Sequence, residues 1–176
     1  MAEANVTAQG AFISTEELAR LIESCPKEEL CILNSTVNPA DELAVYKEHE
    51  KSRIPGAKVL DLTITRELSS PYPHMMPSQA HFIKMMKALN VRKSMTVVIY
   101  ETGKGWFATR AAFMLKAFGH PKVYVLDGGY AKWTSEGRAT EGSDDGAFDS
   151  SYGYVFNGDH MVDYERVKAA SADGSF

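Results

Sequence analysis

The feature that most constrains the fold is a regular alternation of short apolar runs with segments of helical periodicity. The run at residues 30–33 is continuously apolar, which is typical of a strand buried on both faces. Because strands and helices alternate throughout, the sequence predicts an α/β fold with a central, mainly parallel sheet flanked by helices on both faces. The expected strands are 30–33, 58–60, 96–100 and 122–126, and the expected helices follow Ser14, Ser78, Gly105 and Gly128, with a partly helical segment at 41–50.

Several helix ends are marked by single residues. Ser14 precedes an amphipathic segment and Glu17 follows three residues later, which is the pattern of a capping box. Ser78 precedes a second apolar-periodic segment in the same way. Gly119 follows the helix expected at 106–118, where glycine reaches a positive φ without strain.

Composition and charge exclude several classes of function. The chain has 176 residues and a net charge of −4, so no basic excess is available for nucleic acid or an anionic membrane. No apolar run approaches the roughly 20 residues that span a bilayer. The N-terminal segment has neither the pattern of a secretory signal nor that of a transit peptide, so a cytoplasmic location is expected, with a mitochondrial one left open. Two cysteines in no metal-binding pattern predict neither a disulfide framework nor a metal site.

The alternating pattern stops near Gly137. We therefore expect one domain over residues 1–137 and a linker over 138–160, which is rich in glycine, serine and aspartate. Residues 161–170 echo residues 12–21 with an apolar entry, a capping side chain, an early glutamate and an apolar helix face. The echo is either a chance match or the opening helix, over 161–176, of a second copy of the domain that is cut off at Phe176.

Seven ordered stretches resemble the N-terminal domain of the two-domain rhodanese sulfurtransferases, the family of thiosulfate and 3-mercaptopyruvate sulfurtransferases. Each stretch alone is modest, but the ordered set is specific to the family, and 138–176 is similar to its interdomain linker and the first helix of its C-terminal domain. The stretches are STEEL at 14–18, RIPGA at 53–57, SPYPHMMP at 70–77, VVIY at 97–100, FATR at 107–110, FGH at 118–120 and VLDGG at 125–129, followed by Trp133.

The resemblance implies a rhodanese fold and an enzyme that moves sulfane sulfur through a cysteine persulfide without a metal or organic cofactor. That cysteine must be a thiolate, although a free thiol has a pKa of about 8.5. In the family, backbone N–H groups of the loop between the central strand and the next helix supply the stabilising field. Here that loop is Glu101-Thr102-Gly103-Lys104-Gly105, and Glu101 falls where catalytic domains carry the nucleophile. A carboxylate can cap the helix but cannot form a persulfide, so we expect this chain alone to be inactive.

Two functions follow from this expectation. In the first, the chain contributes one wall of a cleft to a C-terminal catalytic rhodanese domain that acts on a small sulfur-containing substrate. In the second, it is a stand-alone binding or regulatory module whose cysteine-free loop holds an anion or a partner peptide.

Two residues are candidates for the cleft or the substrate side. The resemblance places His74 near the reacting sulfur, where an imidazole relays a proton; alternatively, His74 only hydrogen-bonds its own loop. The matching loop of mercaptopyruvate members is preceded by an aspartate that orients the histidine, and this chain has Thr63 there. Arg110 is expected to pair with a carboxylate such as Glu101, to contact the partner domain or, as the minority interpretation, to bind substrate.

Other side chains are interpreted as structural. Cys31 lies in an expected buried strand, and Cys25 ends the first helix, so both are predicted to be inert thiols. Asp61 is expected to be a hydrogen-bond acceptor, and Arg53 a surface residue without a special role. The aromatic residues Trp106, Phe113, Phe118 and Trp133 are predicted to be core.

Overall fold

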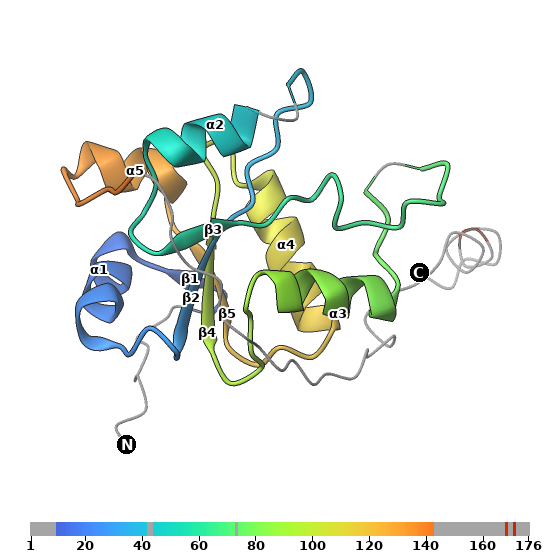
Figure 1. Ribbon diagram of the computed structural model, residues 1–176, viewed down its shortest axis with the longest axis horizontal. Helices are drawn as coiled ribbons and strands as arrows, with labels where there is room; N and C mark the ends of the chain where they lie inside the picture. The colour runs from blue at the N-terminus through green and yellow to red at the C-terminus, as the bar shows by residue number, and fades with distance from the viewer. Residues whose placement is uncertain (1–9, 42–43, 73, 143–167, 169–170, 172–176) are drawn as a thin grey trace.

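A computed structural model describes residues 10–41, 44–72, 74–142, 168 and 171. Its five strands form one parallel sheet in the order β1-β5-β4-β2-β3, so β4 is the central strand (Figure 1). The predicted α/β class and parallel sheet are therefore confirmed. The elements are β1 (Phe12–Ile13), α1 (Thr15–Ser24), β2 (Leu30–Asn34), α2 (Ala44–Lys51), β3 (Ala57–Val59), α3 (Gln79–Ala88), β4 (Thr96–Tyr100), α4 (Trp106–Ala117), β5 (Val123–Leu126) and α5 (Gly129–Ser135).

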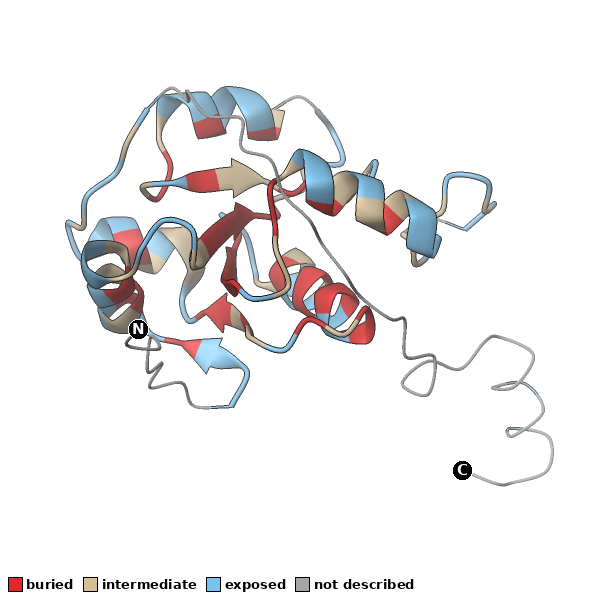
Figure 2. Cartoon of the chain, turned by 60° about the horizontal axis from the view of Figure 1, so that its bottom comes forward, coloured by how far each residue is buried: buried red, intermediate tan, exposed pale blue. Residues whose placement is uncertain are grey.

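Each face of the sheet is covered by its own pair of helices. Alternate residues of a strand point to opposite faces, so Val97 and Ile99 of β4 pack toward α3 and α4. Val98 and Tyr100 pack toward α1 and α5 on the other face. The buried residues accordingly line the sheet and the inward sides of these helices (Figure 2). Helix α2 lies above the sheet in Figure 1 and contacts β3.

The predicted caps are present. The Ser14 hydroxyl accepts a hydrogen bond from the Glu17 amide at 3.1 Å, and the Ser78 hydroxyl accepts one from the His81 amide at 3.3 Å. Gly119 has a φ of 80°, as its position after α4 requires. The observed helix and strand bounds lie within a few residues of those expected.

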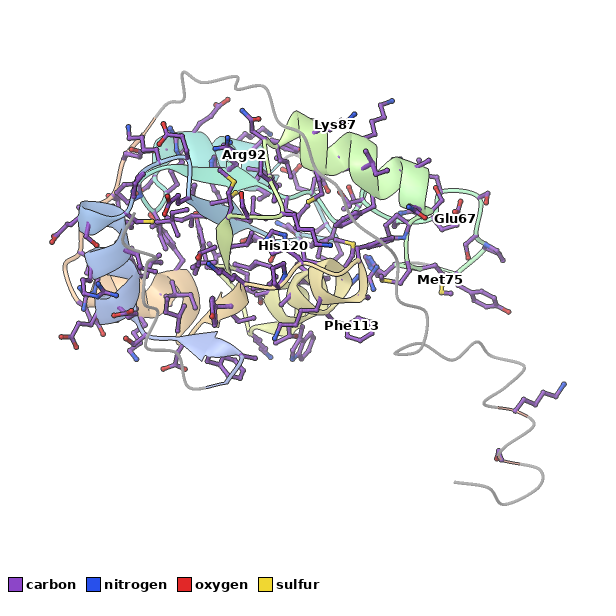
Figure 3. All side chains as sticks on the ribbon, turned by 90° about the horizontal axis from the view of Figure 1, so that it is seen from below. Glu67, Met75, Lys87, Arg92, Phe113 and His120 are labelled. Atoms are coloured by element: carbon purple, nitrogen blue, oxygen red, sulfur yellow. The ribbon has the colours of Figure 1, made fainter. Side chains whose placement is uncertain are left out.

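Two aromatic residues of α4 lie where the sequence did not place them. Phe118 and Trp133 are buried as expected, but Trp106 is 70% exposed and Phe113 is 46% exposed, so the prediction that they are core residues is wrong. The inward face of α4 is built largely from alanines, together with Met114 and Leu115. Small side chains let the helix lie close to the sheet, and the large rings face outward, as Figure 3 shows for Phe113.

Arg53 also departs from expectation, because it is 1% exposed rather than a surface residue. Its Nε lies 3.3 Å from Glu141 Oε1, and its Nη1 donates to the backbone carbonyl of His49 at 3.2 Å. The backbones of Arg53 and Glu141 also exchange hydrogen bonds of 2.9 and 3.0 Å. The buried guanidinium thus fastens the first residues of the predicted linker to the domain.

The rest of that linker, residues 143–160, lies outside the described residues. So does nearly all of the segment 161–176 that was expected to open a second domain. Within the part of the chain that is described, no helix combines the length and the apolar character needed to cross a bilayer.

Candidate functional site

The loop that follows β4 leaves the centre of the sheet at its carboxyl edge. Ligands of parallel α/β sheets bind outside the carboxyl ends of the strands, so this edge is where a site is expected. Residues 101–105 form the loop, and α4 begins directly after it at Trp106. The fold therefore places the predicted loop at the most favourable point for chemistry.

The Glu101 side chain turns back into this loop and is only 3% exposed. Its Oε1 accepts a hydrogen bond from the Gly105 amide at 2.5 Å. Its Oε2 accepts two more, from the Phe107 amide at 2.7 Å and the Ala108 amide at 2.8 Å. These donors belong to the start of α4, where backbone N–H groups lack partners within the helix. The carboxylate therefore caps α4, as the sequence predicted.

Glu101 performs the capping because the residue at the usual position cannot. Gly105 precedes α4 with a φ of 88° and has no side chain to offer. Gly103 also leaves room for the carboxylate, because a Cβ on it would lie 3.0 Å from Glu101 Oε1. The amides of Gly105, Phe107 and Ala108 form an amide-lined cradle. The Glu101 carboxylate, a side chain of the same loop, occupies it.

The backbone of Glu101 is held from the other side by the turn after β5. The Tyr130 amide donates to the Glu101 carbonyl at 3.0 Å. Gly129 has a φ of 57°, and a Cβ there would lie 2.7 Å from the same carbonyl oxygen. Glycine at this turn is therefore required for the close approach of the two backbones.

The outer part of the loop is exposed and carries a positive charge. The Lys104 ammonium lies 5.6 Å from the centroid of the exposed Trp106 ring, within the range of a cation–π contact. The Thr102 amide donates to Thr36 Oγ1 at 3.0 Å, which ties the loop to the segment after β2.

His74 lies beside the start of α4. It has a φ of 59°, which is uncommon for a residue other than glycine. Its ring packs edge-on against the Phe107 ring with centroids 6.0 Å apart. Its Nδ1 is buried and has no hydrogen-bond partner among the described residues, so no bond from this atom to its own loop is present there. A role in proton transfer stays a prediction.

Arg110 lies on α4 and reaches toward the same loop. Its Nη2 donates to the Met75 carbonyl at 3.4 Å, while its Nε is buried without a partner among the described residues. Burial lowers the pKa of Arg110. The expected ion pair with Glu101 is not formed, because three backbone amides already occupy the Glu101 carboxylate.

Neither thiol is near the Glu101 loop. Cys31 is buried within β2, and burial raises its pKa to about 11. Cys25 is the C-cap of α1 and precedes β2, at the amino edge of the sheet, opposite to the loop. Burial also raises its pKa. Both shifts favour the protonated thiol over the nucleophilic thiolate; the inertness of the two cysteines stays a prediction.

Asp61 is the hydrogen-bond acceptor that the sequence predicted. Its Oδ1 accepts from the amide and the hydroxyl of Thr63 at 2.8 and 2.6 Å, and its Oδ2 accepts from the Tyr46 hydroxyl at 2.8 Å. Burial, together with this bond, raises the pKa of Tyr46 to about 12. The amide and the hydroxyl of Thr63 thus both donate to Asp61.

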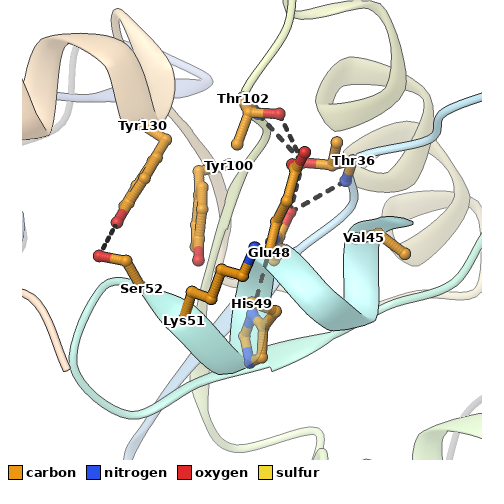
Figure 4. A pocket seen from close by; sticks show the side chains of 10 residues that line it. Thr36, Val45, Glu48, His49, Lys51, Ser52, Tyr100, Thr102 and Tyr130 are labelled. Atoms are coloured by element: carbon orange, nitrogen blue, oxygen red, sulfur yellow. Dashed lines mark hydrogen bonds between the residues drawn. The ribbon is translucent and has the colours of Figure 1, made fainter. Parts of the chain in front are cut away.

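A pocket next to the loop was not predicted. It has a volume of about 260 Å³ and lies between α2 and the carboxyl ends of β2 and β4 (Figure 4). Its wall includes Tyr100, the last residue of β4, and Tyr130 of α5. The sequence gives little indication of this pocket, because Tyr100 is the last residue of an apolar strand and such a residue is expected in the core.

Comparison with known proteins agrees with this geometry. The model of the rhodanese-like domain matches residues 14–136, so the chain belongs to the rhodanese family. A thiosulfate sulfurtransferase of Gallus gallus is 37% identical over 110 residues, which cover 61% of this chain and 38% of the relative. A 3-mercaptopyruvate sulfurtransferase of Escherichia coli is 27% identical over 164 residues, or 93% of this chain and 58% of the relative.

The solved structure of SseA, a 3-mercaptopyruvate sulfotransferase from Escherichia coli, superposes with a TM-score of 0.85 at 29% identity. The match covers 93% of this chain and 62% of SseA. The rhodanese fold expected from the sequence is thereby confirmed. The chain spans between 38% and 62% of the length of these three relatives.

Proposed function

We propose that this chain is a non-catalytic rhodanese domain of the N-terminal type. It serves a sulfurtransferase that moves sulfane sulfur from thiosulfate or 3-mercaptopyruvate to an acceptor. In this proposal the sulfur is carried as a persulfide on a cysteine of a C-terminal catalytic rhodanese domain, and the present chain forms one wall of the cleft between them. The names of the relatives support the substrate class.

The observation that carries the proposal is the state of the amide-lined cradle. A thiolate at neutral pH needs a positive field, and amides at a helix N-terminus supply one. Here three amides are hydrogen-bonded to the Glu101 carboxylate. A carboxylate has no sulfur atom on which to carry a persulfide, and neither cysteine reaches this loop.

The surface around the loop supports a role in forming a cleft. Trp106 and Phe113 expose large rings on α4, seven residues apart and hence on one side of the helix. Met75 is also exposed (Figure 3). Its carbonyl accepts a hydrogen bond from Arg110. Exposed apolar side chains next to polar ones are typical of a surface that another domain covers. We place His74 and Arg110 on the cleft side of this surface.

The direct test is turnover by the 176-residue chain with thiosulfate and cyanide, and with 3-mercaptopyruvate and a thiol acceptor. The expected rate equals the blank for both donors. Turnover above the blank that is lost on alkylation of Cys25 or Cys31 would overturn the proposal.

A second arm tests the cradle itself. Glu101→Cys places a thiol among the three amides, and Glu23→Cys places one on the exposed side of α1 as the matched control. We expect the thiol at position 101 to be alkylated about tenfold faster at pH 7, because the amides lower its pKa. Equal rates in two variants with similar unfolding midpoints would show that the cradle does not stabilise a thiolate.

A stand-alone binding or regulatory module is the second candidate. The observation that favours it is the exposed Lys104 ammonium over the exposed Trp106 ring, a pairing suited to an anion or an acidic peptide. Tight binding of such a partner, abolished by Lys104→Met or Arg110→Met, would favour this function over the first.

The cytoplasm stays the predicted compartment, although one plant relative bears the word mitochondrial in its name.

A further inference from the structure

The positive charges of the chain are concentrated in one part of it. Of its 19 basic and 23 acidic residues, residues 68–126 contain eight basic residues and one acidic residue. The single acid is Glu101, which is buried and bonded to three amides, so no carboxylate of this segment reaches the surface. The segment that holds α3, β4, α4 and β5 is therefore positively charged in a chain whose net charge is −4.

The fold gathers five of these cations at the amino edge of the sheet. Arg92 and Lys93 lie in the loop before β4, and Lys122 directly precedes β5. Lys87 and Lys116 lie in the last turns of α3 and α4, the helices that lead into these strands. Because β4 and β5 are parallel neighbours, both loops lie at the same edge, at the bottom of Figure 1. We call these five residues the basic edge.

Hydrogen bonds hold the two loops of the basic edge together. The Val97 amide donates to the Lys122 carbonyl at 2.8 Å, and His120 Nε2 lies 2.8 Å from the Met95 carbonyl oxygen. Burial lowers the pKa of His120, and the nearby Lys93 ammonium lowers it further. Lys93 and Lys122 therefore lie on adjacent loops around one buried histidine, which Figure 3 labels in the view from below.

Ion pairs do not neutralise these charges. Arg92, Lys93, Lys116 and Lys122 form none within the part of the chain that the structure describes. The neighbouring loop before β2 carries Glu28 and Glu29, but the Arg92 guanidinium donates to the backbone carbonyl of Glu28, at 2.8 Å, and not to its carboxylate. The basic edge thus keeps a positive excess.

Helix stability explains only part of this cluster. A cation in the last turn of a helix interacts favourably with the helix dipole, which accounts for Lys87 and Lys116. Arg92, Lys93 and Lys122 lie in loops, where no such gain is available. Like charges placed together repel one another, and an anionic partner relieves that repulsion.

The surroundings limit the kind of anion. The five cations lie on two helix ends and two loops, so the surface suits an extended anion that reaches several of them. A long nucleic acid would also meet exposed acids such as Glu23 and Glu28, on a chain of negative net charge. A short acidic peptide is affected mainly by the nearest charges, because salt screens charges beyond about 8 Å at physiological ionic strength.

We propose that the basic edge docks a short acidic segment of a partner protein, whose carboxylates pair with these lysines and Arg92. The surface lies at the opposite edge of the sheet from the Glu101 loop and does not depend on the proposed function. Single pairs at a protein surface are weak, so binding requires several pairs at once and decreases as salt increases.

The experiment titrates the ¹⁵N-labelled 176-residue chain with hexaglutamate, hexalysine and hexathymidylate in dilute buffer. Hexaglutamate is expected to cause saturable amide shifts at residues 87–95 and 116–122, and hexalysine should cause none there. Raising the salt from about 20 mM to about 150 mM should weaken hexaglutamate binding about fivefold or more. Hexathymidylate should bind these residues more weakly than hexaglutamate.

Variants of equal net charge separate this surface from general charge effects. Lys93→Gln with Lys122→Gln should weaken hexaglutamate binding about tenfold, because both charges lie in the basic edge. Lys47→Gln with Lys132→Gln is the matched control, since these lysines pair with Asp41 and Asp127 elsewhere on the molecule. The control pair should change the affinity by less than about twofold.

Three results would each overturn the proposal. These are the absence of saturable hexaglutamate shifts at the basic edge, equal affinities of the two double variants, and tighter binding of hexathymidylate, which would assign the surface to nucleic acid. If the Lys93 and Lys122 variant does not fold, Lys116→Gln and Lys47→Gln, both at exposed side chains, give the same comparison. Sulfur transfer is not measured, so failure here is distinct from failure of the proposed function.

Discussion

Two adjacent residues at the end of β4 are both buried and polar, yet their hydrogen bonding is opposite. Glu101 has its carboxylate fully engaged by backbone amides of the loop and α4. Tyr100, one residue earlier, leaves its hydroxyl unpaired in the wall of a pocket. Successive side chains of a strand point to opposite faces, which separates the two environments although the residues are neighbours.

The difference distinguishes a buried polar group that satisfies its neighbours from one whose proton has no acceptor among the described residues. The Glu101 carboxylate satisfies donors that the helix start would otherwise leave unpaired. The Tyr100 hydroxyl is approached by the Ile54 backbone but donates its proton to no described group. We therefore expect the Glu101 carboxylate to stabilise the fold and the Tyr100 hydroxyl to contribute nothing to its stability.

The largest effect is expected from Glu101→Ala. This change leaves three amides at the start of α4 without an acceptor in a buried place, and should lower the free energy of unfolding by about 3 kcal/mol or more. Glu23→Ala, on the exposed side of α1, is the matched control and should have little effect. Chemical denaturation measures the free energy of unfolding of both variants. Equal values would contradict a stabilising role for the Glu101 carboxylate.

Arg53→Met tests a second buried charged group, whose guanidinium is hydrogen-bonded to Glu141 and to the His49 carbonyl. The change removes the bonds to Glu141 and to the His49 carbonyl, and should cost about 2 kcal/mol of unfolding free energy. The cost is moderated because Glu141 is partly exposed and regains water. Arg20→Met, at an exposed pair with Glu17, should change stability little. An Arg53 variant as stable as the Arg20 variant would contradict the role given to the buried guanidinium.

These two positions show what the sequence could and could not predict. Glu101 was predictable as a helix cap, because a carboxylate stands close in the chain to the amides it binds. The burial of Arg53 was not, because its partner Glu141 lies 88 residues away. The exposure of Trp106 and Phe113 was missed for a related reason, since the alanines of α4 decide which face lies on the sheet.

The strands, the caps and the loop after β4 could be predicted because each rests on a local pattern. Apolar runs, single capping residues and glycines with positive φ carry their signal within a few residues. The pocket could not be predicted, because α2, β2, β4 and α5 each contribute to its lining. Only the sheet order brings those segments together.

Tyr100→Phe should have an effect of the opposite sign to Glu101→Ala. Removing an unpaired buried hydroxyl is expected to raise the free energy of unfolding by about 1 kcal/mol. Tyr124→Phe on β5 is the control. A clear loss of stability in the Tyr100 variant would mean that its hydroxyl has a structural partner, and would remove the distinction between the two residues.

The smallest effect concerns alkaline pH. The pKa of Tyr46 is raised from 10.0 to about 12 in the folded state, first by burial and then by its bond to Asp61. Its stabilising contribution is therefore complete below the unfolded value of 10.0 and is lost as the pH rises through about 12. Tyr46→Phe should flatten part of the decline of the unfolding midpoint over this window. An unchanged pH dependence would show that the Asp61 bond does not bias this phenol.

The most direct test of the central claim is the intact mass of the chain after incubation with thiosulfate or 3-mercaptopyruvate, followed by a thiol-trapping reagent and peptide mapping. With a carboxylate in the cradle and both thiols elsewhere, we predict that no peptide gains a sulfur atom. A trapped persulfide on Cys25 or Cys31 would contradict the account.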